Sequence, residues 1–163
     1  MSSNNQSTNQ PLVKAPTALD FLQADHVMIG VSNFEETMQW YKEKLGFREE
    51  RRWTVNELPG VQLAYLEVNG FRIEIIGSSR GLAPFMPSNF TEHIAETKGY
   101  AHLCFRVDNV DAVMAELNRR GVPTFVPATD YPQGAERRVG FIKDNNGNVI
   151  EFAGPLVGTG AHA

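Results

Sequence analysis

Short runs of alternating apolar and polar residues occur in two regions of the chain and predict β-hairpins. In the first region, VQLAYLEV (61–68) and FRIEII (71–76) flank Asn69-Gly70, which favours a two-residue turn because both residues tolerate positive φ. In the second region, RRVGFIKD (137–144) and NVIEFA (148–153) flank 145–147, Asn-Asn-Gly, in the same manner. We therefore expect two antiparallel hairpins.

Apolar residues at helical spacing precede each hairpin region. The first stripe is Phe34, Met38, Tyr41 and Leu45, and the second is Val110, Val113, Met114 and Leu117. Ser32 and Glu35 have the spacing of a capping box, so the first helix should begin near Asn33, and Asp108 takes the cap position of the second. The glycines that end the two helices are Gly46 and Gly121. The stripes indicate two helices packed on a core.

These elements form an internal repeat. The segment VSNFEETMQWYKEKLGF (31–47) aligns with VDNVDAVMAELNRRGVP (107–123), and a strand-like run with one histidine precedes each copy, ADHVMI (24–29) and YAHLCF (100–105). Each copy predicts a strand, a helix and two or three antiparallel strands, so the fold class is α+β. The expected segments are a flexible tail (1–20), a first module (21–77), a connecting loop (78–98), a second module (99–155) and a flexible tail (156–163).

Composition narrows the class of partner. The chain has 163 residues, a formal net charge of -4 and a pI of about 5.6, so nothing in its charge indicates a nucleic-acid or anionic-membrane surface. We expect a small-molecule substrate, no nucleic acid and no membrane. The single cysteine, Cys104, fits a reducing compartment, and the absence of a long apolar run or a signal-peptide pattern predicts a cytoplasmic protein.

Histidine and glutamate recur at matching points of the repeat. His26 and His102 lie in the first strand of each copy, and Glu74 and Glu151 each lie four residues after a hairpin glycine. A single histidine or glutamate in a strand is more often a structural or solvent-exposed residue than a functional one. Taken together, two carboxylates among Ile and Phe are costly to bury, and no Lys or Arg recurs in both copies to compensate them. A divalent metal between the modules would use all four side chains.

These segments resemble the vicinal oxygen chelate superfamily, which includes glyoxalase I, methylmalonyl-CoA epimerase, extradiol dioxygenases and bleomycin-resistance proteins. The resemblance covers roughly residues 22–154. It implies two tandem βαβββ modules whose curled mixed sheets form a metal-binding cleft. It also implies that His26, Glu74, His102 and Glu151 bind one divalent ion: Zn, Ni, Co, Mn or Fe.

The ligand set favours one chemistry within that superfamily. The four ligands resemble those of glyoxalase I and imply a lyase or isomerase that moves a proton beside a metal-chelated carbonyl or hydroxyl of a small, anionic substrate. Glu151 and Glu74 would be the acid/base pair, with Glu151 as the proton acceptor. An Fe(II) extradiol dioxygenase is the alternative enzyme, although such enzymes usually leave the position of Glu74 without a ligand. A metal-free, ligand-sequestering resistance protein is the alternative outside catalysis.

Residues that would hold the substrate follow from strand alternation. Cys104 and Arg106 share the strand face of His102, Met28 shares that of His26, and Arg72 shares that of Glu74. Arg106 and Arg72 are candidate anion contacts, with structural ion pairs at the rim as the alternative. Glyoxalase I has an arginine that holds the glutathione carboxylate where this chain has Gly30, so the use of glutathione is left open. Tyr131 and Arg137, on a loop, are further candidates. A homodimer is expected, and the metal site is either contained in one chain or shared between two.

Overall fold

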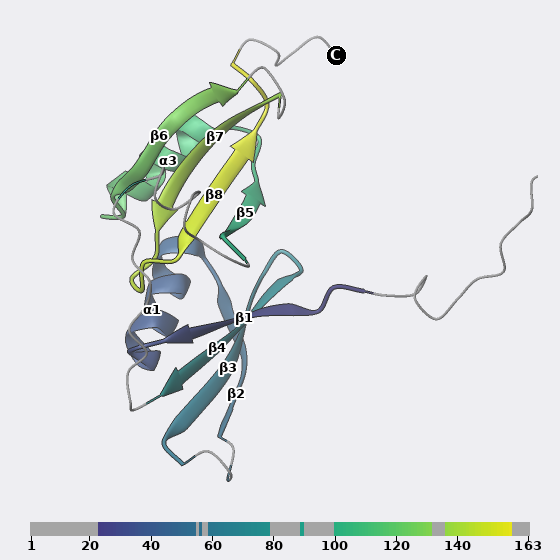
Figure 1. Cartoon of the computed structure of the whole chain (residues 1–163), viewed down its shortest axis with the longest axis vertical. Coiled ribbons are helices and arrows are strands. Elements are labelled where there is room, and N and C mark those ends of the chain that lie inside the picture. The colour runs from purple at the N-terminus through teal and green to yellow at the C-terminus, as the bar shows by residue number, and fades with distance from the viewer. Residues whose placement is uncertain are drawn as a thin grey trace, which may run out of the picture.

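The chain folds into two modules of the same architecture, seen at the bottom and top of Figure 1. The computed structural model describes residues 23–54, 56, 59–78, 89, 100–131 and 136–157. The first module contains β1 (His26–Val31), α1 (Phe34–Leu45), β2 (Arg48–Thr54), β3 (Val61–Val68) and β4 (Phe71–Ser78). The second contains β5 (His102–Arg106), α3 (Val110–Arg119), β6 (Thr124–Tyr131), β7 (Arg137–Lys143) and β8 (Val149–Gly154). The predicted α+β fold of tandem βαβββ modules is confirmed. The expected tail 1–20, most of the connecting loop and residues 158–163 of the second tail lie outside the described residues.

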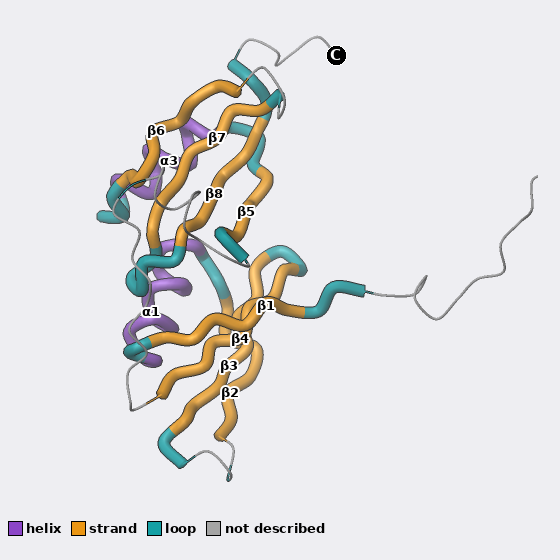
Figure 2. The backbone as a smooth tube through the Cα atoms, viewed as in Figure 1, coloured by secondary structure: helices purple, strands orange, loops and turns teal. Residues whose placement is uncertain are grey.

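Each module forms a four-stranded mixed sheet (Figure 2). The strand orders are β1-β4-β3-β2 and β5-β8-β7-β6. The histidine-bearing strand of each module pairs in parallel with the glutamate-bearing strand, and the other pairings are antiparallel. The parallel pairing therefore places the two predicted ligands of each module on neighbouring strands.

The helix starts differ by one residue from the sequence prediction. Asn33, in extended conformation, is the N-cap of α1 and accepts a hydrogen bond from the Glu36 N–H, so the predicted Ser32 capping box is wrong. Asn109 caps α3 in the same way, in place of Asp108. The Ser32 N–H instead donates to Asn146 Oδ1.

Neither α1, nor α3, nor any other helix within the described residues has the length and apolar character needed to cross a membrane.

The two hairpin turns are not alike. Val68 pairs directly with Phe71 across Asn69-Gly70, and both turn residues have positive φ, as predicted. Lys143 pairs with Val149, which leaves a five-residue turn, 144–148. The prediction that the second hairpin turns in the same manner as the first is therefore wrong. Asp144 organises this longer turn by accepting the N–H groups of residues 146 and 148.

The longer turn joins the second module to the first. The Tyr41 hydroxyl donates to Asp144 Oδ2 at 2.8 Å, and Asn146 Nδ2 donates to Thr37 Oγ1 at 2.8 Å. All four of these residues are buried. Because buried polar groups are costly to separate from their partners, these bonds fix how the modules meet.

One apolar core is shared by both modules. The predicted stripes of α1 and α3 pack on their own sheets, and Met38, Tyr41, Met114 and Leu117 belong to one buried cluster. Leu103 and Phe105, which alternate along β5 with His102, Cys104 and Arg106, also pack against this cluster. Both helices lie on the left in Figure 1. The predicted ligands alternate with the residues that face the helices, so they belong to the opposite sheet faces.

Candidate metal centre

The first module brings His26 and Glu74 together. In the parallel pairing of β1 with β4, Glu74 lies opposite Met28, and alternation places all three on one face. The His26 Nε2 atom lies 3.0 Å from Glu74 Oε2, and Nδ1 lies 3.3 Å from Asp25 Oδ1. The Glu74 side chain is 8% exposed and that of His26 is 29% exposed. This module therefore provides a buried carboxylate and an accessible imidazole.

The second module repeats the arrangement. Glu151 on β8 lies opposite Cys104 on β5, two residues after His102, as Glu74 lies opposite Met28. The His102 Nε2 atom lies 2.9 Å from Glu151 Oε2. The side chain of His102 is 27% exposed and that of Glu151 is 16% exposed. The repeat seen in the sequence is thus also a repeat of donor geometry.

Other charges do not compensate these carboxylates. Arg72, two residues before Glu74, binds Glu50 and Asp25 at 2.7 and 2.8 Å. These two carboxylates raise the pKa of Arg72, and the hydrogen bond from Arg72 lowers the pKa of Asp25. Within the described part of the chain, neither Glu74 nor Glu151 forms an ion pair with a lysine or arginine. The buried Glu74 carboxylate faces His26, and the half-buried Glu151 carboxylate faces His102.

The two pairs do not merge within one chain. Among the residues that the structure describes, no group of three or more His, Cys, Asp or Glu side chains is placed to hold a metal ion. The expected four-ligand cleft is therefore not assembled in the single chain. The structure instead contains two half-sites: His26 with Glu74 and His102 with Glu151.

The fold and the repeated half-sites can be compared with known proteins. The sequence profile of the Glyoxalase/Bleomycin resistance protein/Dioxygenase superfamily matches residues 23–152. The chain belongs to this superfamily. The match covers both modules and all four predicted ligands, so the resemblance noted in the sequence is confirmed.

Individual relatives are more distant. The chain is 26% identical over 120 residues to human mitochondrial methylmalonyl-CoA epimerase, a match that covers 71% of this chain and 64% of the relative. A glyoxalase family protein from Enterococcus faecalis has a TM-score of 0.68 and 27% identity, over 82% of this chain and 98% of that one. Glyoxalase I from Zea mays has a TM-score of 0.61 and 17% identity, over 78% of this chain and 43% of that one. The maize likeness shows a shared fold.

The predicted substrate residues of this superfamily member occupy three different places. Met28 is half exposed and lines a cavity of about 290 Å³ whose wall also includes His102, so this cavity lies between the two modules. Cys104 lies against Glu151; partial desolvation of the thiol and the nearby carboxylate raise its pKa to about 12, which keeps it a neutral thiol. Arg72 is engaged by two carboxylates. Arg106, at the end of β5, lines a different cavity from His102.

Sequence reasoning missed an aromatic row beside the first half-site. The Tyr65 ring centroid lies 5.3 Å from that of His26 and 4.8 Å from that of Trp53. Alternation in VQLAYLEV, combined with the Asn-Gly turn, places Tyr65 opposite Glu74 and was a usable signal. The position of Trp53 beside Tyr65 could not be predicted from alternation, because β2 contains a register shift between Glu49 and Arg51.

Proposed function

We propose that this chain is a metal-dependent lyase or isomerase that moves a proton beside a carbonyl or hydroxyl of a small, anionic substrate. The observation that carries the proposal is the pair of equivalent half-sites, with His–Glu distances of 3.0 and 2.9 Å. A structural histidine–carboxylate contact would not need to recur at the same register in both modules. Two such pairs supply the two nitrogens and two oxygens that suit a first-row divalent ion.

The donor chemistry fits such an ion. The carboxylates of Glu74 and Glu151 are largely removed from water, and a dication would offset the cost of burying both. When bound, the ion would polarise a substrate oxygen and so acidify the neighbouring C–H bond. His26, Glu74, His102 and Glu151 would hold it.

A second copy of the chain would complete the site. The Tyr41–Asp144 and Thr37–Asn146 hydrogen bonds hold the two modules of one chain in an orientation that leaves the half-sites separate. In a two-fold dimer, the first half-site of each copy would face the second half-site of its partner. Such a dimer would contain two identical sites.

The two glutamates would have different roles. The Glu151 side chain is twice as exposed as that of Glu74, at 16% against 8%, so substrate reaches it more readily. Glu151 would accept the substrate proton and return it, while Glu74 would remain a ligand. Arg137 begins β7, and its positive charge partly offsets the rise in the pKa of the Cys104 thiol that desolvation and Glu151 cause, so Arg137 is near enough to the second half-site to contact an anionic substrate.

Proton exchange in D₂O tests the proposal. Acyl-CoA esters, as the likeness to methylmalonyl-CoA epimerase supports, and hemithioacetals would be incubated with the protein, and deuterium uptake next to the carbonyl measured by mass spectrometry. The account expects uptake that EDTA abolishes and added Zn, Ni, Co or Mn restores. Uptake that EDTA leaves unchanged, or protein that binds no divalent ion, would contradict it. Oxygen consumption with a catechol and Fe(II) would favour the dioxygenase alternative.

A further inference from the structure

A chain of ion pairs reaches the His26 imidazole at the nitrogen that faces away from Glu74. Asp25 Oδ1 lies 3.3 Å from His26 Nδ1 and also accepts a hydrogen bond from Arg72 Nη1 at 2.8 Å. Arg72 Nε donates to Glu50 at 2.7 Å, and the Arg72 guanidinium lies 5.0 Å from the Tyr65 ring centroid. The Tyr65 ring lies beside the imidazole, with 5.3 Å between ring centroids. Arg72 therefore contacts both groups that flank the imidazole.

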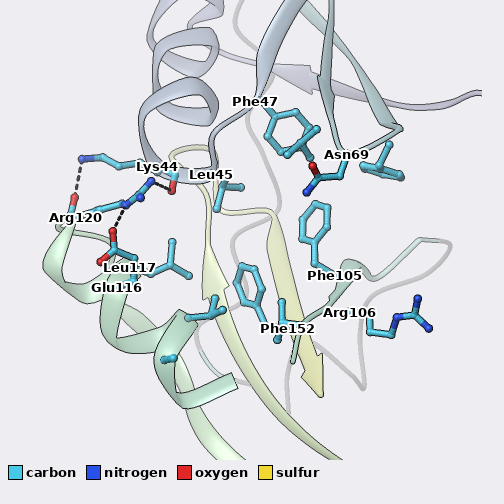
Figure 3. Close-up of a pocket in the computed structure, with 15 residues that line it drawn as sticks. Lys44, Leu45, Phe47, Asn69, Phe105, Arg106, Glu116, Leu117, Arg120 and Phe152 are labelled. Atoms are coloured by element: carbon cyan, nitrogen blue, oxygen red, sulfur yellow. Dashed lines mark hydrogen bonds and ion pairs between the residues drawn. The ribbon is translucent and has the colours of Figure 1, made fainter. Parts of the chain in front are cut away.

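The strand register brings Arg72 to the face of the first half-site. In the parallel pairing of β1 with β4, Arg72 lies opposite His26. Its neighbour Phe71 belongs to the helix side of the sheet, with its ring centroid 5.6 Å from that of Phe105. Figure 3 shows the cavity of about 470 Å³ on that side, with Phe105 among its lining residues. Because side chains alternate along a strand, Arg72 belongs to the opposite face, with His26 and Glu74.

The second module forms the same fold without these two charges. Ala101 takes the place of Asp25 in front of the histidine. Val149, opposite His102 in the β5–β8 register, takes the place of Arg72. An alanine or valine side chain has no group that can form an ion pair or a hydrogen bond, yet the strand orders of the two sheets correspond. The fold of a module therefore does not require the ion pair, which points to a role at the first half-site.

We propose that Asp25, held in place by Arg72, positions His26 to bind the divalent ion through Nε2, a role that rests on the metal-dependent function proposed above. A neutral imidazole carries one proton, and a carboxylate that accepts this proton at Nδ1 leaves the lone pair on Nε2. Nε2 is the nitrogen that lies 3.0 Å from Glu74 Oε2. The hydrogen bond to the carboxylate also makes the imidazole a stronger metal ligand. Asp25 and Arg72 are thus positioning residues, and they orient the first half-site before the ion binds.

Zinc titration of the full-length protein, in competition with a chromophoric chelator, tests this role without any substrate. Asp25→Ala should weaken zinc binding at least about tenfold, as is usual for a carboxylate behind a ligating histidine. Arg72→Ala should weaken it by a smaller factor, because Asp25 remains but loses its anchor. Asp25→Asn keeps an acceptor oxygen and should recover part of the lost affinity. Asp111→Ala, which removes an exposed carboxylate paired with Arg138 in the second module, is the matched control and should leave zinc affinity unchanged.

Magnetic resonance of isotope-labelled, zinc-loaded protein separates positioning from a loss of stability. In the wild type, the His26 Nδ1–H proton should exchange slowly with water because it is bonded to Asp25, and in Asp25→Ala it should exchange faster while the backbone amide spectrum is retained. If Asp25→Ala does not fold, Arg72→Ala compared with Asp111→Ala decides.

Two results would overturn the proposed positioning alone: unchanged zinc affinity in Asp25→Ala, or equal weakening by Asp25→Ala and Asp111→Ala. A wild-type protein that binds no divalent ion would overturn it together with the proposed function.

Discussion

Glu74 and Glu151 occupy the same position of the repeat but have different surroundings. Both occupy the same register beside a histidine, yet Glu151 has the more accessible carboxylate and lies against the Cys104 thiol. The sequence was sufficient to predict that His26 and Glu74 recur as His102 and Glu151, because the Gly70 and Gly147 offsets match, and their role as metal ligands stays a prediction. It could not predict the exposure of each carboxylate, which depends on packing between strands.

The Glu151→Gln variant should separate proton transfer from metal binding. Removal of the carboxylate should lower proton exchange by at least about 100-fold, because the amide cannot accept the proton. Part of the metal affinity should remain, since the amide oxygen is still a donor. Isotope exchange and metal titration measure the two effects. Glu67→Gln, which removes a carboxylate of similar exposure, 14%, that pairs with Arg48 outside the half-sites, is the matched control and should change neither. Unchanged exchange in Glu151→Gln would remove this residue from the mechanism.

The two hairpin turns and the helix caps differ in how well the local sequence predicts them. The strands flanking Asn69-Gly70 have the predicted pairing because the turn geometry is local. The second turn differs because Asp144 and Asn146 form buried hydrogen bonds with α1, more than 100 residues earlier in the chain. Such long-range partners are not encoded in local spacing. The same holds for Ser32, which binds Asn146 instead of capping α1.

The hydrogen bond between α1 and this turn gives a pH-dependent prediction. Burial and the Asp144 charge raise the pKa of Tyr41 well above its usual value. The folded state then keeps a proton that the unfolded chain loses, so the stability from this bond is complete below pH ~10 and declines above it. Tyr41→Phe should reduce the free energy of unfolding by about 1–3 kcal/mol near neutral pH.

Urea unfolding at several pH values measures this effect. The difference between wild type and Tyr41→Phe should shrink as pH rises from about 9 to about 11, because only the wild type loses this contribution. Tyr131→Phe, at an exposed position of β6, is the control and should follow the wild-type curve. A constant difference between wild type and Tyr41→Phe across this range would contradict the account.

At the scale of the whole molecule, the relation between the modules decides the function. The two βαβββ modules predicted from the repeat are confirmed by the fold, and the four metal ligands stay a prediction. Whether one chain closes the site was open in the sequence, because spacing does not specify how two similar modules pack. The buried Tyr41–Asp144 junction and the separate half-sites favour completion of the site by a second copy.

Complementation between two half-site variants tests this central claim most directly. Chains with His26→Ala/Glu74→Ala lack the first half-site, and chains with His102→Ala/Glu151→Ala lack the second. Each alone should bind no metal at the centre. Mixed by co-refolding, the two should form dimers in half of which one of two sites is intact, so bound metal should return to about a quarter of the wild-type amount. A mixture of folded variants that binds no more metal than either variant alone would contradict the shared site.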